Sequence, residues 1–538
     1  MSEFEKGDIV VCGAGLVGSL VSYVLQKRGY NVTMYERYGD IRQIPSIGRS
    51  INLVLTGRGL RAIDAIGGGL REELLELGVA VTGRVMHQMD SSSQYQPYGK
   101  DDSECNYSIS RFGLNKFLIN KATEAGAKIY FGHALDEKGS TFADDDFVNK
   151  GGDVGSTLAF NVRDEDGKDS RVKVACMCPV VACDGAGSRA RYTMRNDGLT
   201  EFTESMLGAD SGSMHGYKEM LFPKDSGLVQ HGLHIWPRRT HMLMALANLD
   251  GSMTGTLYMD TKGEESFEAI STPEASDAFF RKYYPDAIDL VGGIERATTQ
   301  MLENPSGILG TVRTTKWTHR GRVLLVGDAA HAIVPFYGQG MNSGFEDVYD
   351  MLHVLSEMDC RGGVAHPPVE ESVFNDSLAS VSPMNAEDAA KWAAAFDKIF
   401  RDRKPNGDAI AELALMNFEE MRDKVADRCF LLQKRVENLV EKKFESKFRS
   451  MYAMVVYGGG GNITYENALR LGKVQEKILR DLIEDQVDAL YALAEDVWTD
   501  KLDEMAQNVS MTLAEELIDS RLVPLQTSLA IDLSTISH

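Results

Sequence analysis

The 538-residue chain lacks three features that mark other classes of protein. It has no run of about 18 apolar residues, so no transmembrane helix is predicted. Its first residues, Met1 to Lys6, have neither the basic start nor the apolar stretch of a signal peptide, which favours a cytoplasmic location. It also lacks a positive balance of charge, because 57 Lys and Arg stand against 79 Asp and Glu, a net charge of −22. Nucleic acid and anionic lipid are therefore not expected as partners.

The sequence has little cysteine, and its cysteines suggest neither a disulfide framework nor a metal site. Seven is an odd number, and without an export signal we expect reduced thiols. The one cluster, Cys176, Cys178 and Cys183, lies in an apolar run and has the spacing of a strand. Because no fourth ligand follows at the spacing of a zinc finger, we interpret these residues as buried strand cysteines, with metal ligation as the alternative.

The first 36 residues predict a strand, a helix and a second strand, the unit that binds dinucleotides. An apolar strand at 8–12 leads into the glycine-rich segment 13–18, a helical pattern ends near Gly29, and residues 31–36 form the second strand. Glu36 at the end of that strand is placed to accept a hydrogen bond from a ribose hydroxyl. The alternative is a coincidental glycine-rich turn.

The three glycines of this segment have different expected roles. Gly13 permits a tight turn, Gly15 lets the backbone approach a pyrophosphate, and Gly18 lets the helix pack closely on the strand. Leu16 and Val17 open the helix whose N-terminus faces the anion.

Two further motifs follow apolar strands. The first is Asp184-Gly185, and the second is Gly327-Asp328, which runs on to a glycine-rich turn at 338–344. A helix that opens at such a turn points its backbone N–H groups at an anion, and Asp328 at a strand end can bind a sugar hydroxyl. For both aspartates, helix N-capping is the alternative.

Together the three motifs, spread over residues 8 to about 345, resemble the single-component flavin aromatic hydroxylases, which have the p-hydroxybenzoate hydroxylase fold. The resemblance implies that the first motif holds the ADP part of FAD and that Asp328 holds the ribityl chain. It implies that Asp184 serves FAD and the transient NAD(P)H. The flavin ring would lie along the residues after Asp328. Further FAD contacts implied by position are Arg37, Arg111, Leu135, Gly340, Met341 and Asn342.

A narrower resemblance is to the kynurenine 3-monooxygenases within that group. It is carried by segments such as His215-Gly-Tyr-Lys-Glu-Met220 and Leu233-His-Ile-Trp-Pro-Arg238, and it extends to about residue 467. It implies hydroxylation of L-kynurenine to 3-hydroxykynurenine with FAD, NADPH and O2 through a flavin hydroperoxide. The aniline ring is already activated, so we predict no catalytic side chain, and His331 is interpreted as structural. Competing hypotheses are a hydroxylase of a phenolic acid such as salicylate, or a flavin-binding interaction protein.

Four residues are implied by this resemblance as substrate ligands. Arg84 is the natural bidentate partner of the substrate carboxylate, and Tyr98 can donate a second hydrogen bond. Asn417 and Tyr452 match the remaining ligands. Each has a structural alternative: a surface arginine, core tyrosines, and an asparagine bonded to backbone. Tyr337 departs from the family, which has phenylalanine there, and places one extra hydroxyl near the flavin.

The expected fold class is α/β: a Rossmann-like FAD-binding domain with an inserted antiparallel β-sheet substrate domain and a C-terminal helical region. The expected boundaries are 1–83, 111–205 and 310–356 for the first, 84–110 and 206–309 for the second, 357–407 for a loop-rich insertion, and 408–538 for the helical region, with Asp408 as a helix N-cap.

The tail after residue 468 is acidic and amphipathic. Val474, Ile478 and Leu482 recur at helical spacing, so we expect them to pack on the protein or on a second subunit of a homodimer. Eukaryotic members of the family end in an apolar anchor, so the outer mitochondrial membrane, on its cytosolic face, is the alternative to the cytoplasm.

Overall fold

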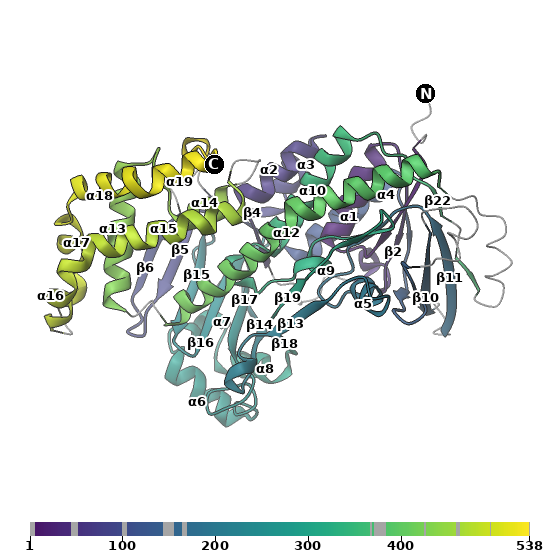
Figure 1. Ribbon diagram of the computed structural model, residues 1–538. Coiled ribbons are helices and arrows are strands. Elements are labelled where there is room, and N and C mark those ends of the chain that lie inside the picture. The colour runs from purple at the N-terminus through teal and green to yellow at the C-terminus, as the bar shows by residue number, and fades with distance from the viewer. Residues whose placement is uncertain are drawn as a thin grey trace.

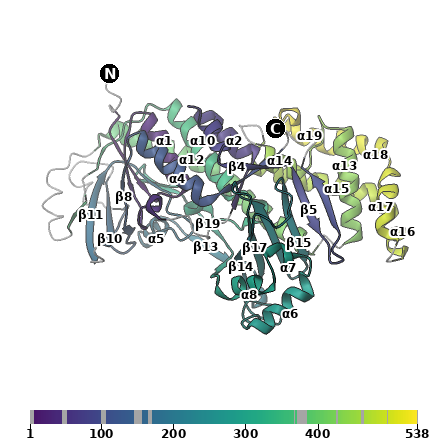
Figure 2. The same cartoon turned by 180° about the vertical axis from the view of Figure 1, so that it is seen from behind.

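The computed structural model describes residues 6–44, 52–98, 105–143, 155–163, 169–365, 368–370, 384–423, 427–458, 463–494 and 497–536. The part of the molecule that contains the N-terminal strand–helix–strand unit and the C-terminal helices lie at opposite ends, with a second β-sheet between and below them (Figures 1 and 2). Within the described residues, no helix is long and apolar enough to cross a bilayer.

The predicted strand–helix–strand unit is confirmed at the N-terminus. Strand β1 (Asp8–Cys12) leads into helix α1 (Leu16–Lys27), and β2 (Asn31–Tyr35) pairs with β1 in parallel. They belong to a six-stranded sheet with the order β20-β21-β12-β1-β2-β8. The other strands are β8 (Lys128–Tyr130), β12 (Val180–Ala182), β20 (Thr318–His319) and β21 (Val323–Leu325).

The cysteine-containing apolar run is two strands rather than one. Strand β11 (Asp169–Met177) belongs to a separate sheet with β10 (Ser156–Arg163), β9 (His133–Leu135), β22 (Val364–Ala365) and β23 (Val369–Glu370), whereas β12 joins the parallel sheet. Cys176, Cys178 and Cys183 are buried, and all seven cysteines are free. The interpretation of the cluster as buried strand-region thiols is therefore confirmed.

The second sheet has seven strands in the order β18-β14-β17-β16-β15-β5-β6. We expected an antiparallel sheet, and all pairs are antiparallel except β5 with β15, which run parallel. Strands β5 and β15 are far apart in sequence and are not joined by a hairpin, which would force them to run antiparallel, so a parallel pairing is possible. The strands are β5 (Gly83–His87), β6 (Ser93–Pro97), β14 (His215–Phe222), β15 (Gly232–Arg238), β16 (His241–Ala247), β17 (Met253–Asp260) and β18 (Ser306–Ile308).

Residues 106–110 differ from the expectation that they belong to the substrate sheet. They form β7 (Asn106–Ser110), which pairs with β3 (Asn52–Leu55) and β4 (Gly78–Val81) in a separate three-stranded sheet. Helices α6 (Pro273–Tyr283), α7 (Ala287–Val291) and α8 (Ile294–Glu303) pack on the seven-stranded sheet around the buried side chains of Trp236, Phe280 and Tyr284.

The prediction of a loop-rich segment up to residue 407 is wrong over its second half. Helix α12 runs from Ala386 to Asp423, so Asp408 lies inside a helix and does not cap one. Trp392, Phe396 and Ile399 are buried at helical spacing, and this packing outweighs the low helix propensity of Pro405 and Gly407 inside α12. Residues 366–367 and 371–383 of the segment lie outside the described residues.

The C-terminal region is helical, as predicted. Ile478 and Leu482 are buried and Val474 is partly buried in a hydrophobic core that the C-terminal helices share, so the tail packs on the protein itself. The helices are α13 (Arg428–Lys443), α14 (Met451–Tyr457), α15 (Tyr465–Ile483), α16 (Val487–Ala492), α17 (Trp498–Gln507), α18 (Met511–Leu517) and α19 (Val523–Ser528).

Candidate functional site

The glycine-rich loop between β1 and α1 is shaped for a close backbone approach. Gly13 has φ +97°, and a Cβ atom there would lie 2.5 Å from the carbonyl oxygen of Cys183. A Cβ on Gly18 would lie 2.0 Å from the carbonyl oxygen of Gly13. Gly15, by contrast, is exposed, and a Cβ there would meet nothing within 4 Å. The first and third glycines thus serve packing, while the second leaves open space for a ligand such as a pyrophosphate.

Glu36 lies just after β2 and reaches back to this loop. One oxygen of its carboxylate accepts a hydrogen bond from the Ala14 N–H at 2.7 Å, and the other accepts from the Tyr38 N–H at 2.9 Å. The carboxylate is therefore held beside the loop, where a ribose hydroxyl would be bound. Arg37 is exposed, with its guanidinium 4.7 Å from the centre of the Tyr38 ring.

The other FAD contacts predicted in the N-terminal part of the chain differ in their exposure and in their position relative to this loop. Asn115 of helix α4 (Arg111–Glu124) donates a hydrogen bond to the Ala14 carbonyl at 3.2 Å. Arg111 is one turn earlier on the same helix and is exposed, so its guanidinium is free to reach an anion at the loop. Leu135 ends strand β9 and packs partly buried against the hydrophobic core. Leu16 and Val17 at the start of α1 are half-buried.

Asp184 is engaged by the helix that follows it. Its carboxylate accepts hydrogen bonds from the Ser188 hydroxyl at 2.5 Å and from the Ala190 N–H at 3.0 Å, at the start of α5 (Arg189–Asn196). Burial raises the pKa of this carboxyl above its ordinary value, although the hydrogen bonds oppose the rise. The helix-start alternative accounts for these contacts. If Asp184 also contacts FAD or NAD(P)H, its carboxylate must do so while it keeps its hydrogen bonds to Ser188 and Ala190.

Asp328 differs from Asp184. It is the first residue of the short helix α9 (Asp328–His331), it is exposed, and its carboxylate has no partner within the described part of the chain. Gly327 before it has φ +63°, and its N–H donates to Asp347 at 2.9 Å. The turn thus presents an unengaged carboxylate, as a ribityl hydroxyl requires.

The glycine-rich turn after α9 leads into helix α10 (Gly340–Glu357). We call residues 335–340 the flavin floor. Gly340 leaves space above the helix start, since a Cβ there would touch only Ile333 at 3.9 Å, and Met341 is buried. Asn342 accepts from the Thr56 N–H at 3.0 Å and donates to the Val54 and Gly338 carbonyls, both at 2.8 Å. Its amide therefore fixes the floor to strand β3.

These features fit FAD. The open space at Gly15, the carboxylates of Glu36 and Asp328, and the helix starts at Leu16 and Gly340 offer a backbone cradle and sugar-binding acceptors. Within the described residues, no group of three or more His, Cys, Asp or Glu side chains is arranged to hold a metal ion.

Three of the four predicted substrate ligands meet at the edge of the seven-stranded sheet. The Arg84 guanidinium on β5 lies 4.7 Å from the centre of the Tyr452 ring and 5.7 Å from that of Tyr98. The two tyrosine rings stack with centroids 5.8 Å apart. The Nε of Arg84 is buried without a hydrogen-bond partner, so a bound carboxylate would supply what the protein leaves unpaired.

Asn417 lies nearby but is occupied by backbone. Its amide nitrogen donates to the Phe336 carbonyl at 2.8 Å and lies 3.4 Å from the sulfur of Met421. This is the structural alternative for that residue: Asn417 holds the flavin floor. Tyr337, next along the floor, stacks on Tyr452 with centroids 6.0 Å apart, and burial raises the pKa of its hydroxyl well above the ordinary value.

Sequence reasoning missed two charged residues of this cluster. Glu420 on α12 interacts electrostatically with Arg84, and its carboxylate lies 3.6 Å from the ammonium of Lys434 on α13. Lys434 also pairs with Glu437 at 3.0 Å. Glu420 is one helical turn beyond Asn417, so helical spacing could have suggested it, whereas nothing local indicated Lys434.

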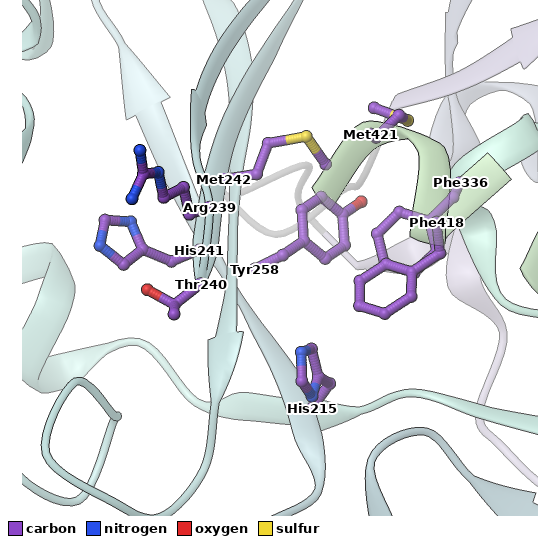
Figure 3. Close-up of a pocket in the computed structure, with 9 residues that line it drawn as sticks. All are labelled: His215, Arg239, Thr240, His241, Met242, Tyr258, Phe336, Phe418 and Met421. Carbon is purple, nitrogen blue, oxygen red and sulfur yellow. The ribbon is translucent and has the colours of Figure 1, made fainter. Parts of the chain in front are cut away.

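An apolar cavity of about 20 Å³ lies beside this cluster, between the sheet and α12 (Figure 3). The rings of Phe336 and Phe418 are 4.5 Å apart, and Tyr258 lies 5.2 Å from Phe336. Met242 and Met421 line the cavity with them. It has room for about one water molecule, so these side chains must move to admit a substrate ring.

The contacts of His331 are with buried protein groups and fit the structural role that we expect for it. Its Nε2 lies 2.7 Å from the Asp347 carboxylate, and its ring stacks on Trp317 with centroids 4.9 Å apart. Burial would raise the pKa of Asp347, but His331 and Arg403 outweigh burial and lower it to about 2. Asp347 therefore stays charged and holds both His331 and the Gly327 turn.

The chain matches solved structures of the same fold. One is P. aeruginosa PqsL in complex with 2-aminobenzoylacetate, with a TM-score of 0.52 and 17% identity, over 77% of this chain and 96% of that one. Another is the tetrameric form of 2-methyl-3-hydroxypyridine-5-carboxylic acid oxygenase, with a TM-score of 0.53 and 16% identity, over 78% and 94%. At such identities the likeness shows the fold alone.

Closer matches are found in sequence. Residues 6–362 match the family model described as FAD binding domain. A kynurenine 3-monooxygenase of Myxococcus xanthus (strain DK1622) is 34% identical over 530 residues, 97% of this chain and 97% of the relative. One of Flavobacterium johnsoniae is 36% identical over 90% of this chain and 95% of the relative. One of Dictyostelium discoideum is 32% identical over 89% and 94%. Matches of this extent, from bacteria and from an amoeba, show that the chain belongs to the kynurenine 3-monooxygenase family of FAD-dependent monooxygenases.

Proposed function

We propose that the protein hydroxylates L-kynurenine to 3-hydroxy-L-kynurenine with NADPH and O2. The observation that carries the proposal is the meeting of Arg84, Tyr98 and Tyr452 beside an apolar cavity at the flavin floor. A half-buried arginine whose Nε is buried and unpaired suits a carboxylate, and a cavity lined by Phe336 and Phe418 suits an aromatic ring.

Bound FAD supplies the electron transfer from NADPH and the activation of O2. The protein binds and orients the substrate. Arg84 receives the carboxylate, because a guanidinium binds it with two parallel hydrogen bonds. Tyr98 and Tyr452 flank that position. Glu420, an acid that interacts electrostatically with Arg84 and lies 3.6 Å from the Lys434 ammonium, is the residue we assign to the α-ammonium.

Exclusion of water is the second task of the chain. Phe336, Phe418 and Tyr258 are 7%, 7% and 9% exposed and surround the cavity where the aniline ring would be held. A dry, fixed ring is needed because water at this position would divert activated oxygen into wasted oxidation of NADPH. The hydroxyl of Tyr337 stays protonated there, as its raised pKa implies, and is a donor.

The test is turnover by the purified protein. NADPH oxidation should be slow alone and faster with L-kynurenine, and 3-hydroxykynurenine should form in step with NADPH consumption. Salicylate is the comparison substrate, because it has a ring and a carboxylate but no α-ammonium. Stimulation and hydroxylation with salicylate but not with kynurenine would overturn the proposal.

We infer a cytoplasmic location as part of this proposal. It is supported by the seven cysteines, all of which are free, because a reducing compartment keeps thiols unpaired. Assembly as a homodimer stays a prediction.

A further inference from the structure

Arg58 is a fully buried arginine outside the substrate cluster. It lies on helix α2 (Gly57–Ile66), directly after strand β3, and its side chain has no solvent exposure. Its Nε donates to the Val455 carbonyl at 2.9 Å, and one terminal nitrogen donates to the carbonyls of Met454 at 3.0 Å and Ile463 at 2.9 Å. The guanidinium therefore binds the last turn of α14, the helix that carries Tyr452, through the carbonyls of Val455 and Met454, and the latter also accepts from the Gly458 N–H at 3.1 Å.

The other terminal nitrogen of Arg58 connects to the FAD-binding half. It pairs with Glu346 of α10 at 2.6 Å, and the second carboxylate oxygen of Glu346 pairs with Arg403 of α12 at 2.7 Å. Arg403 pairs in turn with Asp347 at 2.7 Å, the residue that holds the Gly327 turn. Burial would raise the pKa of Glu346, but the two arginines outweigh it and hold the pKa below its ordinary value, so the chain of ion pairs stays charged.

A second connection runs through Tyr465 at the start of α15. The Arg58 guanidinium lies over its ring, 3.9 Å from the centre, and the Tyr465 hydroxyl donates to the Gln339 side chain at 2.8 Å. Gln339 belongs to the flavin floor and is fully buried. Arg58 thus touches the end of α14, the start of α15 and, through Glu346 and Tyr465, both the helix under the floor and the floor itself.

We propose that Arg58 is a positioning residue for substrate recognition. It fixes α14, and with it Tyr452, relative to the flavin floor, so that the carboxylate site at Arg84 lies at a set distance from the ring-binding cavity. The inference rests on the proposed function for its substrate. The inference goes beyond the proposed function because it assigns substrate specificity to Arg58, which touches neither Arg84 nor Tyr452 in the described contacts.

A purely structural role would have a different signature. Removing one partner of a buried ion pair is destabilising chiefly when the other charge is left without compensation. Loss of Arg58 would leave Glu346 still paired with Arg403, so the FAD-binding half keeps its charge balance. What is lost is the set of hydrogen bonds to the last turn of α14, and the effect should therefore appear at Tyr452 rather than at the FAD loop.

The experiment uses the FAD-loaded enzyme with Arg58→Lys and Arg58→Met. Ligand affinity is measured from the change in flavin absorbance with L-kynurenine and with kynuramine, which is kynurenine without its carboxylate. We expect Arg58→Met to weaken kynurenine binding about 10-fold or more, kynuramine binding less than about 2-fold, and FAD retention not at all. Arg58→Lys should be intermediate, because one ammonium cannot serve three carbonyls and Glu346 together.

Arg61→Met is the matched control. Arg61 is on the same helix, and its Nε and one terminal nitrogen are buried without hydrogen-bond partners within the described residues. This variant should bind kynurenine as the parent enzyme does. Equal weakening of kynurenine and kynuramine by Arg58→Met, or equal effects of Arg58→Met and Arg61→Met, would overturn the proposal.

Two further measurements keep the test decisive if Arg58→Met fails to fold. In a double-mutant cycle, Arg58→Lys and Tyr452→Phe should be non-additive for kynurenine affinity, whereas additivity would refute a role through Tyr452. In the absence of substrate, Arg58→Lys should speed hydrogen exchange in residues 451–457 and not in 16–27. That readout stands even if kynurenine is not the substrate, so failure of the proposed function and failure of this inference are distinguishable.

Discussion

Arg84 and Tyr452 lie 4.7 Å apart, guanidinium carbon to ring centre, although one belongs to β5, next to the edge strand of the seven-stranded sheet, and the other to a C-terminal helix. The contact joins two parts of the chain that are far apart in sequence, strand β5 and helix α14. It also means that the substrate carboxylate would be bound only when the C-terminal helices are packed in place.

Arg84→Met is expected to weaken the binding free energy of L-kynurenine by about 2–4 kcal/mol, because the carboxylate loses a charge-assisted partner. FAD content should not change, since Arg84 is remote from the glycine-rich loop in the fold. Titration of the flavin absorbance measures both. Arg71→Met, at an exposed ion pair with Asp64, is the control. An unaltered affinity in the Arg84 variant would show that another group binds the carboxylate.

Asp328→Ala is expected to lower FAD retention with little change in the stability of the apoprotein, because the carboxylate is exposed and has no partner in the described residues. Asp184→Ala should behave differently and cost about 1 kcal/mol of stability, because the Ala190 N–H loses its acceptor. Absorbance after gel filtration gives flavin content, and thermal unfolding gives stability. Full flavin retention in the Asp328 variant would remove its assigned role.

The nucleotide-binding unit could be predicted from sequence because its signals are local. Gly13, Gly18 and Glu36 act within one strand–helix–strand unit, and their spacing carries the geometry. The substrate ligands could be named only through family resemblance, since Arg84 and Tyr452 are brought together by long-range packing.

Lys434 and Arg58 were missed because they depend on tertiary contacts with no local signature. The loop-rich insertion was expected to run to residue 407, yet Gly407 lies inside α12, where a Cβ on it would lie only 3.1 Å from His331 and Trp317. The glycine is thus explained by close packing inside a helix rather than by a turn. Arg58 is likewise unremarkable in sequence, because nothing nearby indicates that it meets carbonyls of α14.

Stability should fall as the pH is lowered from about 6.5 to about 4. Burial is the largest cause that lowers the pKa of His241 to about 4, and the nearby charges of Arg238 and Lys282 add to it. Between pH 6.5 and 4 the histidine is therefore protonated in the unfolded chain but neutral in the folded one. The loss is on the order of 3 kcal/mol for this histidine. Asp350 acts in the opposite sense, since burial raises its pKa to about 6. The test is therefore the difference between parent and variant.

The variant is His241→Asn, whose amide oxygen can replace the ring nitrogen bonded to Tyr284 at 2.7 Å. Its unfolding free energy should decline less steeply between pH 6.5 and 4 than that of the parent, measured by denaturant titration with excess FAD. Parallel pH profiles for the two proteins would show that His241 does not titrate as its burial implies.

The protein should stay in the supernatant when centrifuged with anionic vesicles at physiological salt. The apolar side chains Ile478 and Leu482 face the protein core, and the outer surface of an acidic chain is repelled by anionic headgroups. Neutral vesicles are the control for non-specific adsorption. Pelleting that requires residues 505–538 would favour the membrane location instead.

The tail should contribute to the fold of the C-terminal region. Ile518 is fully buried in the core shared by the C-terminal helices, whereas Leu513, in the preceding helix α18, is 39% exposed. Ile518→Ala is expected to cost about 2–5 kcal/mol, because it removes buried methyl groups and leaves a cavity, and Leu513→Ala less than about 1 kcal/mol. Hydrogen exchange of α15 and α18 in the FAD-loaded protein measures this region directly. Equal protection from hydrogen exchange in the Ile518→Ala and Leu513→Ala variants would mean that the tail does not pack as the structure has it. Residues 505–538 would then not be needed to hold the other C-terminal helices in place.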